Sequence, residues 1–407
     1  MIHKIIIFLF LFISGGAIIT IGTATYFYIL FTVILAGCFL LSRKRLKASA
    51  PSIRNILVLG SFFLVLIVLR GESLIFQDNG TIVLKFVILF IFSIYVTTFF
   101  DTNEAFFSKL VSVFEFLIKL SAATFIIMNI LPGLLVNVGA KNTITGDQFQ
   151  TLFGLAYARS ADFEKYKFYR NQSIFWEPGV YGVMITTVYI IKVFYLKQKK
   201  GIFWYVAAAI STLSMGGITV FLLLLVAKFF LSGSDKQFTE KLPALAIVVG
   251  LPLFAIFDFV YSYSSDIELL VGAIFKRNLS TDTSVNTRYQ DLYYGFLASK
   301  NNLWTGHGQD FTNYYKITTD ALNTSKESYN GGITNSIISI LYCYGIFYLL
   351  LYLIFMFKAV KTLTSNSRYA LLVLFAFIGL LMLEPLHFAL FIVFIFTFRE
   401  SKKTILT

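Results

Sequence analysis

Residues 169–179 combine charged, polar and aromatic side chains directly ahead of an apolar run. They read YRNQSIFWEPG. Arg170 carries a guanidinium, which binds two phosphate oxygens at once and stays charged at neutral pH. Glu177 lies one or two helical turns further on and precedes Pro178, which disturbs backbone hydrogen bonding. The two charges either neutralise each other or line a cavity that binds an anion and offers a carboxylate as a general base.

Two further arginines are candidates for the same anion site. Arg288 lies in a polar segment far along the chain, and Arg159 shortly precedes Arg170. Because each guanidinium binds two oxygens of an anion, Arg170 and Arg288 together would form a clamp on a strongly charged anionic group. The alternative for Arg288 is an ordinary ion pair with Asp282 or Asp291, and the alternative for Arg159 is a solvated loop charge.

Three residues of the second half have side chains that could contact a ligand. His307 stands between two glycines in WTGHGQDF, residues 304–311, so it either approaches a ligand closely or belongs to a tight turn. Trp304 begins the same stretch and suits either stacking on a sugar or packing within a folded loop. Asn335 begins an apolar run, where it either binds a phosphate or sugar or caps the helix. No acidic pair has the spacing of a metal site, so we expect neither a metal nor a cofactor.

The chain that carries these residues has the composition of an integral membrane protein. Of its 407 residues, 57% are hydrophobic and 14% are charged, whereas about 25% are charged in typical soluble proteins. The mean hydropathy is +0.77, and a soluble fold cannot bury that much apolar surface. Cys38 and Cys343 both lie in apolar runs, which argues against a disulfide framework or a thiolate metal site.

Apolar runs of about 20 residues predict helices that cross the hydrocarbon core of a membrane. We therefore predict an all-α polytopic membrane protein with about twelve such helices. The predicted segments are 4–21, 24–41, 53–69, 82–100, 109–131, 174–195, 202–215, 217–231, 242–262, 333–357, 369–384 and 386–398. The seventh, eighth and twelfth are short for a span.

Clusters of Lys and Arg orient the predicted helices. They follow the second, sixth, tenth and last helices and flank the ninth. Counting helices between the clusters places all of them on one side, which the positive-inside rule makes the cytoplasm, with both termini there. The formal net charge of +13 is therefore a topology signal, and we expect no nucleic-acid partner.

The predicted spans and two long polar segments divide the chain into five parts. Both polar segments fall outside the cytoplasm by the helix count, and loops of this length are usually functional. The parts are helices one to five (1–131), a first outer loop (132–173), helices six to nine (174–262), a large outer loop or cap (263–332), and helices ten to twelve with a cytoplasmic tail (333–407).

Ionisable residues within the predicted spans need a partner or a function. Glu115 and Lys119 are four apart, in the order that favours an intrahelical ion pair. Lys192 lies near a helix end, from which its ammonium can reach the headgroup region. Glu384 lies near the outer end of segment 369–384, and the local sequence does not decide whether it faces an outer cavity.

Taken in order, several stretches resemble the bacterial O-antigen polymerase and O-antigen ligase superfamily. The likeness covers about residues 150–398. After 169–182 come a Thr/Ser-rich break at 211–217, Arg288 with a Gly-x-Gly at 306–308, Thr334-Asn335-Ser336 before a helix, and Glu384-Pro385 in a closing hairpin. The family usually has an Arg near the first break, where Met215 and Gly216 stand here. Thr334 replaces a His of the ligase branch, which favours the polymerase branch.

The resemblance implies a GT-C-like glycosyltransferase at the periplasmic face of the bacterial cytoplasmic (inner) membrane. Donor and acceptor would be glycans carried on undecaprenyl pyrophosphate, which reach the site through the membrane lipid, and a polysaccharide chain-length regulator would be a partner. The expected catalytic residues are Arg170, Glu177 and Arg288, and the expected substrate-binding residues are Asn335, His307, Arg159 and Trp304. The alternatives are a ligase that transfers glycan to lipid A-core, a polymerase of capsule or exopolysaccharide, and a transporter or lipid flippase.

Overall fold

The computed structural model has a helix in each predicted membrane segment that it describes. It describes residues 1–14, 24–42, 51–72, 77–141, 148–152, 156–159, 169–175, 177–231, 292–322, 333, 335–364, 367–384, 386 and 388–398. Every predicted segment except 242–262, which lies outside these residues, is at least partly helical.

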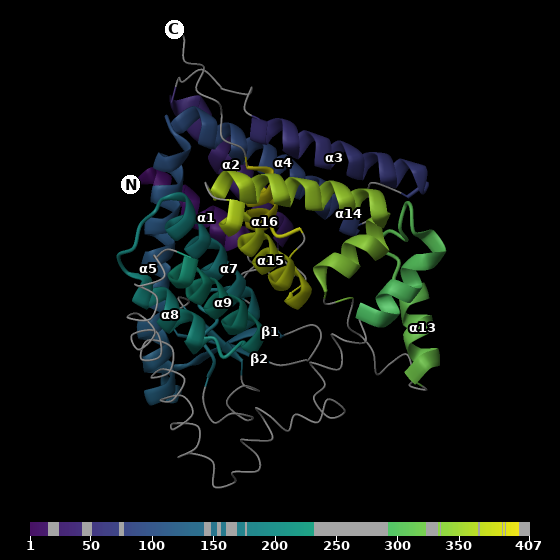
Figure 1. Ribbon diagram of the computed structural model, residues 1–407. Helices are drawn as coiled ribbons and strands as arrows, with labels where there is room; N and C mark the ends of the chain where they lie inside the picture. Colours follow the sequence, from purple (N-terminus) through teal and green to yellow (C-terminus); the bar gives the residue numbers. More distant parts are fainter. Residues whose placement is uncertain are drawn as a thin grey trace.

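The N-terminal part is a set of five helices. They are α1 (Ile2–Ser14), α2 (Ala24–Ser42), α3 (Pro51–Leu69), α4 (Gln77–Phe99) and α5 (Asn103–Ile130). Thr102 begins α5 as its N-cap, because its hydroxyl accepts a hydrogen bond from the backbone N–H of Ala105 at 3.1 Å. In Figure 1, α3 lies beside α14 (Ser336–Leu363) of the C-terminal half, and contacts between the two helices join the halves of the chain.

The C-terminal part adds a second group of helices. They are α7 (Pro178–Ile190), the π-helical turn η3 (Ile191–Tyr195), α8 (Ile202–Ser211), α9 (Met215–Leu231), a short helix at 292–299, the 3₁₀ turn η4 (Lys300–Asn302), α13 (Thr312–Leu322), α14 (Ser336–Leu363), α15 (Ser367–Leu383) and α16 (Leu390–Thr397). Every residue of α7 is buried, so α7 is a central helix, and it contacts α8, α9 and α15.

Within the described residues, six helical stretches are long and apolar enough to cross a membrane. They are Thr25–Ser42, Pro51–Leu69, Asn79–Phe99, Asn103–Ile130, Pro178–Tyr195 and Ser336–Leu363. Large apolar side chains such as Leu64, Phe116 and Phe347 are exposed on several of them, which water would not favour but lipid would. The chain is therefore a mostly helical, multi-pass membrane protein.

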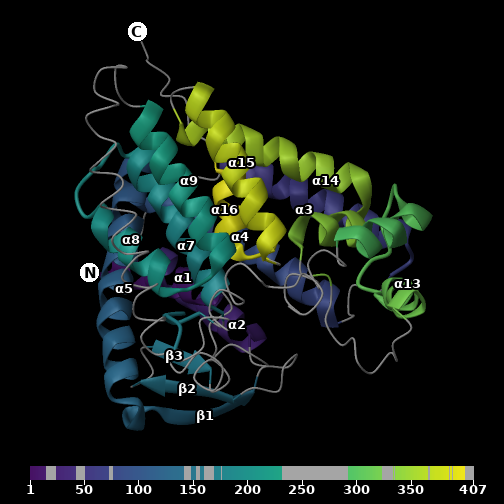
Figure 2. The same ribbon diagram turned by 60° about the horizontal axis from the view of Figure 1, so that its bottom comes forward.

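A small sheet departs from the predicted all-α fold. Its three antiparallel strands, in the order β1-β2-β3, are β1 (Val136–Lys141), β2 (Gln148–Leu152) and β3 (Ala156–Arg159). Ala156 and Ala158 lie on one face of β3, where they cluster with Leu152 of β2, Met128 of α5 and Tyr169. The sheet occupies part of the predicted outer loop 132–173, at one end of α5 (Figure 2).

An ion pair between two helices replaces the pair predicted within one helix. Glu115 of α5 binds the ammonium of Lys192 on η3, instead of pairing with Lys119. The Lys192 side chain is only 4% exposed, so it does not reach out to the headgroups as predicted. The π-helical turn widens the helix by one residue, and such turns often mark functional positions. Here the turn carries the lysine that ties α7 to α5.

Candidate functional site

The stretch 169–175 forms a buried polar elbow before α7. Tyr169 pairs with Asn129 near the end of α5: its N–H donates to Oδ1 at 2.8 Å, and its carbonyl accepts from Nδ2 at 3.2 Å. The Tyr169 hydroxyl donates to Oε1 of Gln150 on β2 at 3.0 Å, and burial raises the pKa of this phenol, which keeps the donor protonated. The elbow is thus fixed to both α5 and the sheet.

Asn171 attaches the elbow to the end of α8. Its backbone N–H donates to the carbonyl of Ser211 at 2.9 Å, and its side-chain Nδ2 donates to Oγ of the same residue, also at 2.9 Å. Ser173, with φ 51°, adopts a left-handed conformation that sharpens the turn, and its carbonyl accepts from the N–H of Tyr157 on β3 at 3.0 Å. The stretches 169–182 and 211–217, two of those on which the family resemblance is based, are therefore in contact here.

The start of α7 meets the ends of α14 and α15. A Cβ atom placed on Gly179 would lie 1.9 Å from Oε1 of Glu384, so the Glu384 carboxylate rests on the first turn of α7. Glu384 is 3% exposed, and the positive end of the α7 dipole stabilises a buried anion there. Ser336, at the start of α14, donates to the Glu384 carbonyl and accepts from the N–H of Leu386.

We call this convergence the polar junction; it is made of Asn171, Gln172, Glu177, Gly179, Ser211, Asn335, Ser336 and Glu384. Helices α7 and α9 approach closely beside it, since a Cβ on Gly182 of α7 would be in ordinary van der Waals contact, at 3.7 Å, with the Cα of Gly217 on α9. Stretches that are more than 200 residues apart in sequence therefore meet at one end of the helix bundle.

Two polar side chains of the polar junction leave bonding capacity unused. Gln172 is 0% exposed, and neither its Nε2 nor its Oε1 has a hydrogen-bond partner; an amide buried in this way costs free energy unless something binds it. Glu177 is the N-cap residue of α7 but makes no capping bond with its side chain. Glu177 and Arg170 both belong to the described residues, and no ion pair joins them to each other there.

The remaining predicted site residues fall in different places. Asn335 is 2% exposed and caps α14, because its Oδ1 accepts from the N–H groups of Ile337 and Ile338 at 3.0 and 3.2 Å. Arg170 is half-buried on the elbow. Arg159 ends β3, but its side chain lies outside the described residues, as does Arg288.

His307 and its two glycines pack against a break in α14. The helix loses its regular conformation at Gly345, which has φ 79° and ψ 176°. Because the helical bonds fail there, the carbonyls of Tyr342 and Cys343 accept instead from the N–H groups of His307 at 2.7 Å and Gly308 at 2.9 Å. Ile346 in turn donates to the carbonyl of Leu303 at 2.8 Å. The loop thus satisfies backbone groups that a membrane would leave unpaired.

The side chain of His307 is held by its neighbours. Its Nε2 lies 3.0 Å from the carbonyl of Ala298, so this nitrogen carries the proton, and Nδ1 lies 3.4 Å from Nδ2 of Asn302. The ring stacks on Tyr342 with centroids 4.7 Å apart. Trp304, by contrast, is 61% exposed and stacks on Phe347 at 5.2 Å. The geometry gives His307 a tight-turn position and places Trp304 on the surface.

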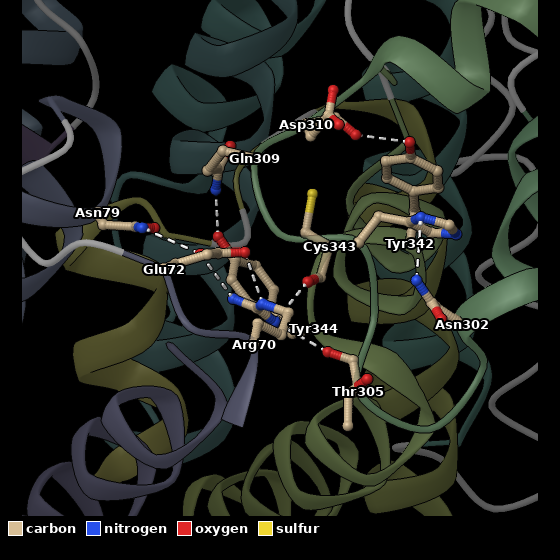
Figure 3. Close-up of polar contacts among 11 residues, drawn as sticks. Arg70, Glu72, Asn79, Asn302, Thr305, Gln309, Asp310, Tyr342, Cys343 and Tyr344 are labelled. Carbon is tan, nitrogen blue, oxygen red and sulfur yellow. Dashed lines mark hydrogen bonds and ion pairs between the residues drawn. The ribbon is translucent and has the colours of Figure 1, made fainter. Parts of the chain in front are cut away.

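An ion pair that was not predicted secures the same break (Figure 3). Arg70, just beyond α3, binds Glu72 through Nε at 2.6 Å, and its Nη1 donates to the carbonyls of Thr305 at 2.8 Å and Cys343 at 3.1 Å. Asn79 of α4 donates to Glu72 at 3.0 Å. We call these residues the Arg70 cluster. Its only local signal is the sequence Arg70-Gly71-Glu72 at the end of an apolar run.

A single methyl group at Gly179 is expected to disturb the polar junction. Gly179→Ala would place Cβ 1.9 Å from a carboxylate oxygen of Glu384, and that side chain is buried with its backbone held by Ser336. We expect a melting temperature in detergent clearly below the parent's. Gly182→Ala, one turn further along α7, meets nothing closer than 3.7 Å, so it should be neutral or stabilise the helix by about 0.5 kcal/mol. Equal melting temperatures for both variants would contradict the close contact.

No family model, no curated protein and no solved structure matches this chain.

Proposed function

We propose that this multi-pass membrane protein polymerises lipid-linked glycans at the periplasmic face of the bacterial cytoplasmic membrane. Donor and acceptor are repeat units on undecaprenyl pyrophosphate, of O-antigen or a related surface polysaccharide. In this proposal the chain crosses the membrane about twelve times in a GT-C-like arrangement, and both termini are cytoplasmic. A chain-length regulator is its partner in the membrane. No metal or nucleotide is required, because release of the lipid pyrophosphate drives the reaction.

The observation that carries the proposal is the polar junction. Four of the stretches that suggest a glycan polymerase, 169–182, 211–217, 335–336 and the residue Glu384, are distant in sequence and come together there. The sheet lies at this end of the bundle (Figure 2), and the helix 292–299 packs on the start of α14 through Gly295 and Ile338. The positive-inside rule predicts that both lie outside the cytoplasm. Arg170 lies on the elbow, and Glu177 begins α7. A polar site at helix ends near the membrane surface suits a substrate with a lipid tail and a charged headgroup.

The proposed chemistry uses Glu177 and Gln172 of the polar junction, Arg170 of the elbow, and Arg288, whose part in the site is a prediction from the sequence. The hydroxyl of the acceptor sugar attacks the anomeric carbon of the donor sugar, the new glycosidic C–O bond forms, and the bond to the pyrophosphate oxygen breaks. The hydroxyl proton passes to the carboxylate of Glu177, which has no capping bond to compete for it. The leaving pyrophosphate gains negative charge, and Arg170 with Arg288 neutralises it. Gln172 offers an amide to the sugar.

The transporter alternative has one observation in its favour, the broken helix α14. Discontinuous helices of transporters expose backbone carbonyls that bind the coupled ion. In this chain the carbonyls of Tyr342 and Cys343 are already occupied by His307, Gly308 and Arg70. The sequence also lacks the internal repeat that is common among such transporters. The break therefore supports a fixed loop better than an ion pathway.

Analysis of surface glycan in a deletion strain tests the proposed function. Without the gene, we expect lipid A-core that carries a single repeat unit, because ligation continues while chain extension stops. The purified protein in liposomes should lengthen a repeat unit on undecaprenyl pyrophosphate. Bare lipid A-core would instead identify the ligase reaction, and an unchanged ladder of chain lengths would contradict both reactions.

A further inference from the structure

The short helix 292–299 presents its large apolar side chains outward. Leu292, Tyr293 and Phe296 are 38%, 53% and 48% exposed, whereas Gly295 and Ala298 face the protein and are buried. A Cβ on Gly295 would lie 2.5 Å from Cγ2 of Ile338 on α14. A helix exposed to water normally shows the opposite pattern, with polar residues outward. The outward face therefore needs an apolar neighbour.

The stretch continues into a second outward-facing aromatic contact. Trp304 stacks on Phe347 of α14 at an interplanar angle of 29°. Phe347 begins an exposed row that runs along α14 through Leu350, Ile354 and Phe357, and the spacing of three and four residues keeps these side chains on one helical face. Because α14 is long and apolar enough to span a membrane, this row faces lipid, and Trp304 extends it.

The polar groups of the stretch fit the edge of a bilayer. Lys300 is exposed, and its Nζ lies 5.6 Å from the ring centroid of Phe296, close enough for a cation–π contact. Tyr and Trp concentrate at membrane surfaces because their rings are amphipathic, and a lysine beside them can reach lipid phosphates while its stem stays in the apolar region.

We propose that residues 292–304 lie in the membrane–water interface, with their outward face among lipid headgroups and upper acyl chains. The occupant of this face is membrane lipid, since the face is continuous with the lipid-facing row of α14 and carries a lysine at its end. Trp304 is then a membrane anchor of the cap and not a sugar-stacking residue. This assignment is independent of the glycan chemistry proposed above.

Spin labels on single cysteines test the assignment. In a background with Cys38→Ala and Cys343→Ala, the variant Phe296→Cys is labelled and placed in nanodiscs of phosphatidylethanolamine and phosphatidylglycerol. Leu350→Cys is the lipid-facing control, and Thr312→Cys is the control at an exposed position of the cap. We expect the ratio of collisions with oxygen to collisions with a water-soluble nickel chelate to be several-fold higher at 296 than at 312, and close to the ratio at 350.

Two results would overturn the proposal. A ratio at 296 equal to that at 312 would place the helix in water. Low collision rates with both reagents would mean that protein covers the face, from a second copy of the chain or a partner. Tyr293→Cys places a label on the same outward face. If the Phe296→Cys variant does not fold, the collision ratio at 293 tests the proposal in its place.

Discussion

Arg288→Ala is expected to abolish chain extension while the protein is still made and inserted into the membrane. Removal of a group that stabilises developing charge in a transition state costs about 10²–10³-fold in rate, and the pyrophosphate leaving group develops such charge. The measurement is the distribution of glycan lengths on a gel, in cells that carry the variant as their only copy of the gene. Full-length glycan from this variant would refute the clamp assignment.

The Lys variant at the same position separates geometry from charge. Arg288→Lys keeps the positive charge but loses the planar fork that binds two oxygens, so we expect it to be impaired as well. Normal activity would reduce the role of Arg288 to bulk charge. Lys316→Ala, which removes an exposed cation from α13, serves as the control and should leave chain lengths unchanged.

Gly345→Ala is expected to cause the largest loss of stability among single methyl additions. At φ 79° and ψ 176° the backbone occupies a region that essentially only glycine adopts. A Cβ would also lie 2.2 Å from the carbonyl oxygen of Trp304, and this backbone atom cannot move aside cheaply. We expect the loop at 303–308 to detach from α14, at a cost of more than about 3 kcal/mol.

Limited proteolysis and thermal unfolding in detergent measure this effect. The variant should melt at a lower temperature and be cleaved within 300–311 under conditions that spare the parent protein. Gly37→Ala in α2, where nothing lies within 4 Å of the added methyl, is the matched control and should melt at or above the parent temperature. Unchanged protection of the loop in Gly345→Ala would contradict the docking geometry.

The sequence was sufficient for the helices because their signal is local. Runs of about 20 apolar residues predicted α3 within two residues of both ends, and α4, α5 and α14 within six. The predicted segment 174–195 began four residues before α7, which starts at Pro178. The sheet was missed because β2, with the sequence QFQTL, is short and mostly polar, and its stability comes from packing on Met128 and Tyr169. Nothing within five residues of sequence encodes that contact.

Contacts between side chains that are far apart in sequence were likewise not predictable from the residues around each of them. Glu115 has a well-placed lysine four residues away, yet the buried end of η3 brings Lys192 closer. The role of Arg70 depends on Thr305 and Cys343, which no spacing rule connects to it. For Asn335, by contrast, the helix-capping alternative could be stated from its place before an apolar run, and the observed bonds are those of a cap. Which side chains share a junction is decided by packing over the whole chain.

The Arg70 cluster also sets an order of assembly. Arg70 bonds to residues 235 and 273 positions later in the chain, and the loop at 303–308 precedes the segment of α14 on which it docks. During synthesis α3 is therefore complete long before either of its partners exists, and the loop emerges without its acceptors. The loop at 303–308 can dock only after this part of α14 has been synthesised, so the bonds of Arg70 to Thr305 and Cys343 form late in the assembly of the chain.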